Sequence, residues 1–539
     1  MGRPRRGRPV LQWYDYSMKP VVLLVAAAVV VAACQGSTPT PSPSPSSVVL
    51  PSSAPTSTPT STPSPTPKTP LGGTLRVALS GAIGSLDPQL ADANPVVVGQ
   101  IFEGLVASGA NGVVPALATK WLVGADGRAW TFTLRDGVTF HDGAPLDAAA
   151  VAKSLGRPND PLIEKVEASD PRTVVVTTRV PYGPFLSALT TAPYLIVSPA
   201  SRTWGTGPFR VPAGGEGVRP LILDRNDRYW RADASGQKLP YLDKLSLTTI
   251  ADPGTRLASI RTGNVDFIQD LALGDVGTIR TDPSLQLVVR PETTVLYLGV
   301  NLSSAPLDDL RVRQAIAQAL NPRSLVDRLY AGVATPASQF PPSTMLGYDD
   351  SVAEFAKPDP AAARKLLADS AHPTLQLDLW FLADGNVAGP DMRKAAEAIA
   401  ADLAASGISV DTKTIDPITF AQSVRDNRYP MWLGLGSAAS FDPDELLGAF
   451  FIPKIGIGTG KDEPTEAGAW INAEAAGLLR KAHSEPDQSK RAELYKQVTK
   501  IVQREIPRIP LAWSSPPAAA TGKLVNARGT LFADVGMGK

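Results

Sequence analysis

The stretch that decides the fold is PALATKWLVGADGRAWTFTLRDGVTFHDGAPL, which runs from Pro115 to Leu146. Trp130, Phe132 and Leu134 alternate within it with polar residues, which is the period-two pattern of a β-strand with one buried face. Asp-Gly pairs punctuate the stretch at 126–127, 136–137 and 142–143. Glycine accepts a positive φ at little cost, so these pairs indicate tight turns. The stretch therefore predicts a small antiparallel sheet.

The same stretch resembles the signature region of the extracytoplasmic solute-binding proteins of peptide/nickel-type ABC importers. That family has a phrase of the form PALAxxW…DGxxWTFxLRDGVxFHDGxPL at this point. The resemblance runs from about Leu71 to Trp513, and further motifs follow in the order of the family: SLDP at 85–88, EGL at 103–105, GTGPF at 205–209, NDRYW at 226–230, YLGVN at 297–301 and VRQAIAQAL at 312–320. In GTGPF, we interpret the glycines as a tight bend that touches no ligand.

Length and charge narrow the class of protein. A chain of 539 residues is too long for one ordinary core and predicts two or three domains. The net charge is +1, but residues 1–33 hold five Lys or Arg against one Asp, so the remainder carries −3. This balance argues against a nucleic-acid partner, which would require a clustered basic surface. With Cys34 as the single cysteine, the sequence excludes a disulfide framework.

The N-terminus predicts an exported and anchored protein. Val21–Ala33 is an apolar run of thirteen residues, which is too short for a membrane span and fits a signal peptide. The run ends in Val-Ala-Ala-Cys, which resembles a bacterial lipobox with Cys34 as the lipidated residue. The alternative is an ordinary cleavage site beside a free cysteine. Met18 is an alternative start of the leader, and the Arg5-Arg6 pair lacks the apolar residues that twin-arginine export requires.

A tether follows the leader. From Ser37 to Pro70, 29 of 34 residues are Pro, Ser or Thr. Such a segment buries too little apolar surface to offset its ordering entropy, and its prolines favour extended conformations. At about 3 Å per residue, it would hold a domain on the order of 100 Å from its anchor. A leader, a tether and a globular body together predict a lipoprotein on the outer face of the cell membrane. Taken alone, these parts also fit a structural role in the cell wall.

Helices are predicted where capping residues meet apolar stripes. Asp252 and Asp359 each stand before a proline and are expected to be N-caps. Gly263 and Gly407 lie just past the ends of predicted helices. The last clear helix is RAELYKQVTKIVQREIP, which Pro507 ends.

The resemblance implies an α/β fold of two lobes, the type II periplasmic-binding-protein fold in its three-domain variant, with a hinge between the lobes. The segment between Val151 and Thr173 is short for the family, so the second domain is expected to be reduced. The expected organisation is a signal peptide at 1–33, the lipidated cysteine and linker at 34–70, domain I at 71–117, 200–303 and 507–539, domain II at 118–199, and domain III at 304–506.

The loop MWLGLGSAASFDP, Met431–Pro443, is the most informative about the ligand. The candidate ligand-binding residues are Trp432, Ser437, Ala439, Phe441 and Asp442. In peptide-binding members an aspartate four residues before the proline pairs with the α-ammonium group of the peptide, and here that position is Ala439. The nearest carboxylate, Asp442, either replaces it or caps the turn that follows. Trp432 and Phe441 either form an apolar wall or belong to the core.

The sequence gives no catalytic site. A Ser-His-Asp triad needs a histidine, and only His141, His372 and His483 are present, without a G-x-S-x-G motif. In the FHDG turn, the resemblance implies a structural role for His141. Scattered histidines and a single cysteine also argue against a zinc site, and nothing points to a pair of glycosidase carboxylates. Gly456–Lys461 lacks the first glycine and the final Ser or Thr of a phosphate-binding loop.

These observations predict a receptor without chemistry or cofactor of its own. We expect a monomer that captures an oligopeptide or peptide-like solute and passes it to the permease of an ABC importer. A sugar or a metal chelate remains an alternative ligand; nickel itself is disfavoured because the Met431–Pro443 loop has no histidine. The alternative function is a surface lipoprotein that acts as a sensor or scaffold without transport, and a more remote alternative is a secreted hydrolase. A neighbouring permease gene would favour transport, and a neighbouring sensor kinase gene would favour the alternative.

Overall fold

The computed structural model describes residues 69–109, 112–158, 160–352, 357–382, 389–452, 454–455, 462–463, 468, 470–529 and 531–538. Cys34 and the predicted leader lie outside these residues, as does nearly all of the predicted tether. In the described part of the chain, no helix combines the length and the apolar character that a membrane span requires.

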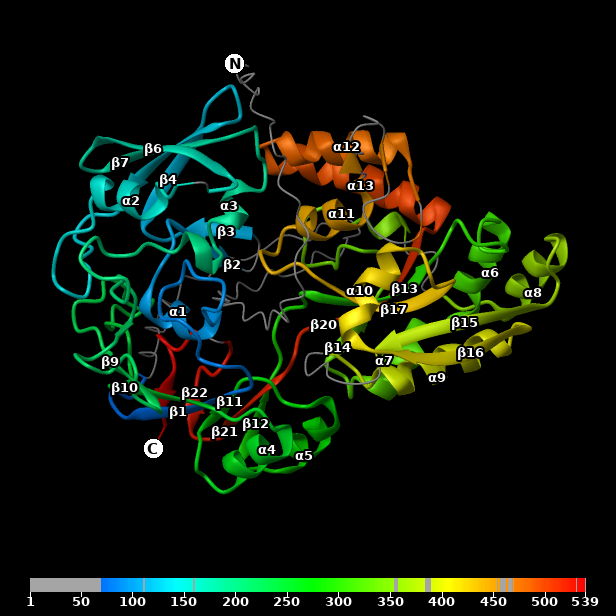
Figure 1. Cartoon of the computed structure of the whole chain (residues 1–539). Coiled ribbons are helices and arrows are strands. Elements are labelled where there is room, and N and C mark those ends of the chain that lie inside the picture. Colours follow the sequence, from blue (N-terminus) through cyan, green and yellow to red (C-terminus); the bar gives the residue numbers. More distant parts are fainter. Residues whose placement is uncertain are drawn as a thin grey trace, which may run out of the picture.

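Two lobes carry the fold (Figure 1). The main sheet of the first lobe has the strand order β12 (Leu285–Val288), β21 (Ala518–Thr521), β11 (Phe267–Ile268), β1 (Thr74–Leu79), β10 (Lys244–Thr249), β9 (Leu221–Arg225) and β8 (Phe209–Arg210). Strand β1 runs parallel to both β10 and β11. The alternating residues Leu75, Val77 and Leu79 are fully buried, which makes β1 the centre of this core.

The small sheet of the first lobe contains the stretch that decides the fold. Its antiparallel order is β4 (Ala118–Val123), β5 (Ala129–Leu134), β7 (Thr173–Thr178) and β6 (Ile163–Asp170). Trp130, Phe132 and Leu134 are buried on one face of β5, and the glycines of all three Asp-Gly pairs have positive φ. The predicted antiparallel sheet with tight turns is therefore confirmed. Helices α2 (Ala148–Leu155) and α3 (Phe185–Ala188) bury residues in the same core.

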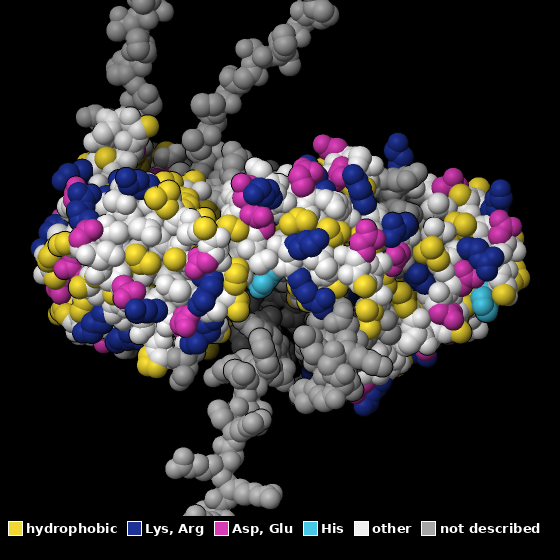
Figure 2. All heavy atoms as spheres, turned by 90° about the horizontal axis from the view of Figure 1, so that it is seen from above, with side chains coloured by type: hydrophobic (Ala, Val, Ile, Leu, Met, Phe, Trp, Pro, Cys, Tyr) yellow, Lys and Arg dark blue, Asp and Glu magenta, His cyan; other side chains and the backbone are white. Residues whose placement is uncertain are grey.

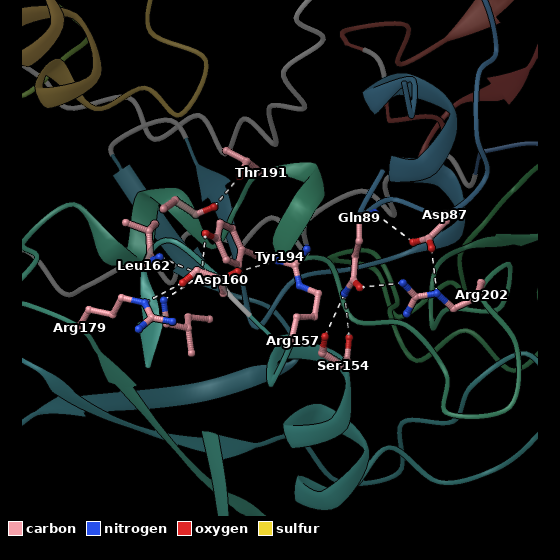
Figure 3. Close-up of polar contacts among 12 residues, drawn as sticks. Asp87, Gln89, Ser154, Arg157, Asp160, Leu162, Arg179, Thr191, Tyr194 and Arg202 are labelled. Carbon is pink, nitrogen blue, oxygen red and sulfur yellow. Dashed lines mark hydrogen bonds and ion pairs between the residues drawn. The ribbon is translucent and has the colours of Figure 1, made fainter. Parts of the chain in front are cut away.

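A buried carboxylate organises the short connection between α2 and β6 (Figure 3). Asp160 accepts hydrogen bonds from the backbone N–H groups of Leu162 and Ile163 at 2.9 and 2.8 Å. Its other oxygen lies 3.0 Å from Arg157 Nη2. Arg179 Nε donates to the Asp160 carbonyl at 2.8 Å. These bonds give the polar groups of the turn their partners locally. A longer helical segment is therefore not needed to hold the connection.

The sheet of the second lobe has the order β14 (Ala334–Pro336), β20 (Arg508–Ser514), β13 (Thr294–Val300), β17 (Met431–Ser437), β15 (Leu375–Leu382) and β16 (Ile408–Ile415). One face packs against α6 (Leu310–Ala319), α7 (Pro322–Leu329), α8 (Pro360–Asp369) and α9 (Met392–Ala404). The other face packs against α11 (Pro443–Phe451), α12 (Ala473–Ser484) and α13 (Gln488–Glu505). Helices α11, α12 and α13 lie on the side of the first lobe (Figure 1).

The remaining elements are α1 (Pro95–Ile101), α4 (Pro253–Arg261), α5 (Val276–Thr281), α10 (Pro417–Arg425), the single turns η1 (Ala192–Tyr194) and η2 (Leu273–Asp275), and the short strands β2 (Val106–Gly109), β3 (Gly112–Pro115), β18 (Lys454–Ile455), β19 (Asp462–Glu463), β22 (Leu524–Val525) and β23 (Gly536–Met537). The predicted caps are confirmed, since Asp252 and Asp359 accept hydrogen bonds from the first turns of α4 and α8. Gly263 and Gly407 follow their helices with positive φ.

Two chain segments connect the lobes. Residues 289–293 lead from β12 to β13, and residues 515–517 lead from β20 back to β21. We therefore call 69–293 with 515–538 the first lobe and 294–514 the second lobe. The predicted domain limits stay a prediction, although β13 and β20 lie in ranges assigned to domain I and pair in the sheet of the second lobe. Both strands are almost wholly buried apolar runs, so their sequences do not indicate which sheet they join.

Charges of both signs are mixed over the face of the molecule seen from above (Figure 2). No single-sign field dominates this face, in agreement with the small net charge of the chain.

Replacing Asp160 tests the short connection between α2 and β6 in the part of the first lobe formed by β4–β7, α2 and α3, which we call the small domain. We expect Asp160→Ala to lower the free energy of unfolding by about 3 kcal/mol, because two backbone donors and a mostly buried arginine lose their acceptor. Chemical denaturation measures the change. The control is Asp136→Ala, which removes an exposed ion pair with Arg172 and should cost no more than about 1 kcal/mol. Equal losses in both variants would contradict the role of Asp160.

Candidate functional site

The carboxyl ends of parallel strands mark the candidate site, because ligands of open α/β sheets bind beyond these ends. In the first lobe, Ser80 follows β1 and Asp270 follows β11. In the second lobe, β17 runs parallel to β15 and is followed by the loop at 438–442. The Ala438 N–H donates to the Thr293 carbonyl at 2.9 Å, so this loop lies beside a connection between the lobes.

On the side of the first lobe, a buried ion pair ties the two connections together. Arg290 Nη2 lies 2.9 Å from Asp270 Oδ1, and the two side chains are 4% and 1% exposed. Arg290 Nε donates to the Pro516 carbonyl at 2.8 Å, which joins residues 289–293 to residues 515–517. The Ser80 hydroxyl donates to Asp270 Oδ2 at 2.5 Å. The charge of Asp270 is therefore balanced within the protein.

On the side of the second lobe, the candidate residues differ widely in exposure. Trp432 is only 1% exposed and packs over Gly299, where an added Cβ would lie 2.1 Å from the indole ring. It is a core residue. Phe441 is half-buried against the same core and has a φ of 57°. Ser437 is exposed at the end of β17, and Ala439 is half-buried. A direct role of these residues in ligand binding stays a prediction.

Asp442 makes three kinds of contact at once. As the N-cap of α11, it accepts a hydrogen bond from the Asp444 N–H at 3.0 Å, which confirms the capping interpretation. Arg491 Nη2 of α13 lies 2.5 Å from the same oxygen. The other oxygen accepts a hydrogen bond from the Ser187 hydroxyl of α3 at 3.1 Å. Because Ser187 belongs to the first lobe, Asp442 joins the two lobes.

The neighbouring groups complete a buried polar network. Asp444 accepts a hydrogen bond from the Tyr495 hydroxyl at 3.1 Å and lies 2.9 Å from His483 Nδ1. Burial raises the pKa of Tyr495 well above its usual value, so the phenol stays protonated as a donor. Burial alone would lower the pKa of Arg491. The interactions with Asp442 and Tyr495 raise this pKa by more than burial lowers it, so the net shift is upward. The guanidinium therefore stays charged.

The third carboxylate of this region is also engaged. Glu445 Oε2 accepts hydrogen bonds from the N–H and the hydroxyl of Ser440 at 3.0 and 2.9 Å. Asp442, Asp444 and Glu445 thus each have a partner within the protein. A cation leaving water needs a fixed opposite charge. A ligand ammonium group at this loop would have to compete with Arg491 for Asp442.

The GTGPF turn and His141 form a structural unit. Cβ atoms added at Gly205 or Gly207 would lie 2.2 and 2.6 Å from the backbone of Ile101, so both glycines serve close packing. His141 Nε2 lies 3.1 Å from the Gly207 carbonyl, and its Nδ1 lies 3.3 Å from the Gly205 nitrogen. Burial lowers the pKa of His141 to about 4, which keeps the ring neutral near pH 7. These contacts agree with the tight bend and the structural histidine expected from the sequence.

Sequence reasoning missed Ser187 and Arg491, which both contact Asp442. One signal pointed to Arg491, because it precedes Tyr495 by one helical turn on the stripe that α13 buries. A charged residue on such a stripe needs a buried partner. For Ser187 the sequence carries no comparable signal. Among the residues that the structure describes, no group of three His, Cys, Asp or Glu side chains could hold a metal ion.

Two lobes joined by paired connections, with strand ends meeting between them, define a binding protein of the periplasmic type. The family model for bacterial extracellular solute-binding proteins, family 5 (middle), matches residues 112–456, which is more than half of the chain. The chain belongs to this family. Proteins of the family are extracytoplasmic substrate-binding proteins of ABC importers.

Individual relatives agree with this assignment. The chain is 26% identical over 543 residues to the heme-binding protein A of Haemophilus influenzae, covering 92% of this chain and 94% of that protein. It is 27% identical over 444 residues to the dipeptide-binding protein of Escherichia coli, covering 76% and 82%. The solved structure of HbpA2 from Haemophilus parasuis superposes with a TM-score of 0.75 at 24% identity, covering 87% of this chain and all of that chain. These likenesses establish a shared architecture.

Removing Arg491 tests the buried network. We expect Arg491→Met to lower the free energy of unfolding by about 3–5 kcal/mol, because the Asp442 charge stays buried without its partner. Thermal or chemical denaturation measures the loss. Asp442→Asn in the same chain should recover part of it, because the amide keeps the N-cap and carries no charge. The control Arg323→Met removes an exposed pair with Asp327 and should change stability by less than about 1 kcal/mol. A loss no larger than that of the control would contradict the account.

Proposed function

We propose that the protein is a lipid-anchored receptor that captures a peptide-like solute without a free amine and delivers it to the permease of an ABC importer. Membership of family 5 supports capture of a solute for an importer. Two relatives are a heme-binding protein and a dipeptide-binding protein, so relatives of one fold bind chemically different solutes. The ligand class of this chain therefore has to be argued from its own site.

The proposed ligand class is supported by the balance of charges around the loop at 438–442. The resemblance of the Met431–Pro443 loop to peptide-binding members implies that Ala439 stands where those members have the aspartate that pairs with the α-ammonium group. Asp442, the nearest carboxylate, is paired with Arg491 at 2.5 Å. Glu445 is engaged by Ser440. An amine-blocked peptide would avoid the cost of placing an unpaired cation here, which a free-amine peptide would bear.

The anchor is inferred from the N-terminus. Val21–Ala33 supplies the length and apolarity of a signal-peptide core, and Cys34 follows it in a lipobox-like sequence. The Pro-, Ser- and Thr-rich segment at 37–70 gives the reach for a monomeric receptor to meet a permease in the same membrane. Opening about the connections at 289–293 and 515–517 would admit the solute, and closure would favour the bound state.

A matched pair of peptides tests the ligand class. A library of short peptides is prepared twice, once with free and once with acetylated N-termini, and each is added to the protein in a thermal-shift assay. We expect the acetylated forms to raise the melting temperature more. A ligand at 100 times its Kd stabilises the native state by about 2.7 kcal/mol, which corresponds to a shift of a few degrees. Stabilisation by free-amine peptides alone would contradict the proposed class.

The control is the variant Ala439→Asp, which restores a carboxylate at the position implied by the family. The variant should respond better than the parent to the free-amine peptides, and its response to the acetylated peptides should be no stronger. An unchanged preference would mean that residue 439 does not contact the end of the ligand.

A further inference from the structure

The small domain touches the second lobe at a place distinct from the two connections. The Gly183 N–H donates to the His483 carbonyl at 2.7 Å, and Arg491 Nη1 lies 3.4 Å from the Gly183 carbonyl. Ser187 donates to Asp442 across the same boundary. We call Gly183, Ser187, Asp442, His483 and Arg491 the interlobe contact. Its residues come from α3 and the loop before it and from the ends of α11, α12 and α13, which lie on the sides of the two lobes that face each other in Figure 1.

The second lobe lies so close to Gly183 that no side chain fits at this position. A Cβ at this position would lie 2.0 Å from the carbonyl oxygen of Glu485 and 3.0 Å from Arg491 Cδ. Both obstacles belong to the second lobe, and Gly183 itself has no left-handed backbone. The rings of Tyr182 and His483 lie 4.8 Å apart beside it. Glycine is therefore required at position 183 because the two lobes are so close together, and not because of the backbone conformation of the turn.

We call the arrangement in which this contact is formed the closed state, and we propose that the interlobe contact maintains it without a ligand, with Asp442 and Arg491 as positioning residues. Asp442 and Arg491 both belong to the second lobe and pair there, so closure needs no further pairing of their charges. Closure adds a hydrogen bond to a charged acceptor, from Ser187, and one from a charged donor, Arg491. Such bonds are stronger than neutral ones. The closed state is therefore populated in the free protein before any solute binds.

The inference rests on the proposed movement of the lobes, and it concerns the equilibrium before the solute binds. A binding-competent open state that is only fractionally populated lowers the apparent affinity by that fraction. The interlobe contact thus lowers the apparent affinity for the solute, although most of its residues lie outside the loop at 438–442. Weakening it should raise the open population while leaving each lobe folded.

Distance measurements between spin labels test this inference in the absence of solute. Cysteines replace the exposed Lys120 of the first lobe and the exposed Gln497 of the second lobe, in the full chain carrying Cys34→Ser. The parent should show mainly the short distance of the closed state. In Gly183→Ala, steric conflict with Glu485 should lower the ratio of closed to open protein at least tenfold. Ser187→Ala removes one hydroxyl and should lower the ratio by a smaller factor.

The control is Gly217→Ala, because a Cβ at Gly217 has no neighbour within 4 Å and the residue has no positive φ. It should match the parent. Distance distributions for Gly183→Ala and Ser187→Ala that equal the parent would overturn the inference. No solute takes part, so a wrong ligand class leaves this result unaffected. A distance change on adding a solute, without any change in the two variants, would overturn the role of the contact alone.

Discussion

The rest of the structure depends on the burial of one negative charge, that of Asp442. A carboxylate that is 5% exposed is stable only if its charge is balanced and its oxygens are hydrogen-bonded. Arg491 supplies the balance, which fixes α13 against the start of α11. The Asp444 N–H and Ser187 supply the remaining hydrogen bonds, which fix the helix start and the small domain. One side chain thereby sets the position of a helix, a loop and a lobe.

The same constraint shapes the candidate site. The carboxylates around the loop at 438–442 are engaged within the protein, and on the opposite side Asp270 is paired with Arg290. These carboxylates are therefore paired with protein groups before any ligand enters. Recognition then relies on shape, apolar contact and neutral hydrogen bonds, which are the usual means of small-molecule sites. The proposed ligand, a solute without a free amine, would need no unpaired carboxylate at such a site.

Local patterns made much of the fold predictable. The alternation around Phe132, the Asp-Gly turns and the caps at Asp252 and Asp359 follow from neighbouring residues, and the structure confirms them. The motifs also led to the family, which the family model confirms. The interlobe contact was not predictable, because Arg491 lies 49 residues from Asp442 and Ser187 lies 255 residues from it. Trp432 shows the same limit, since an apolar strand does not reveal that a glycine opposite makes room for its ring.

A double-mutant cycle between Ser187→Ala and Asp442→Asn tests the central claim most directly. Both single variants and the double variant are unfolded with denaturant, and the changes in the free energy of unfolding are compared. The account predicts a coupling energy of at least about 0.5 kcal/mol, because the two side chains form one bond across the lobes. Strict additivity would mean that Asp442 does not join the lobes in solution, and the account of a closed, charge-balanced receptor would be contradicted.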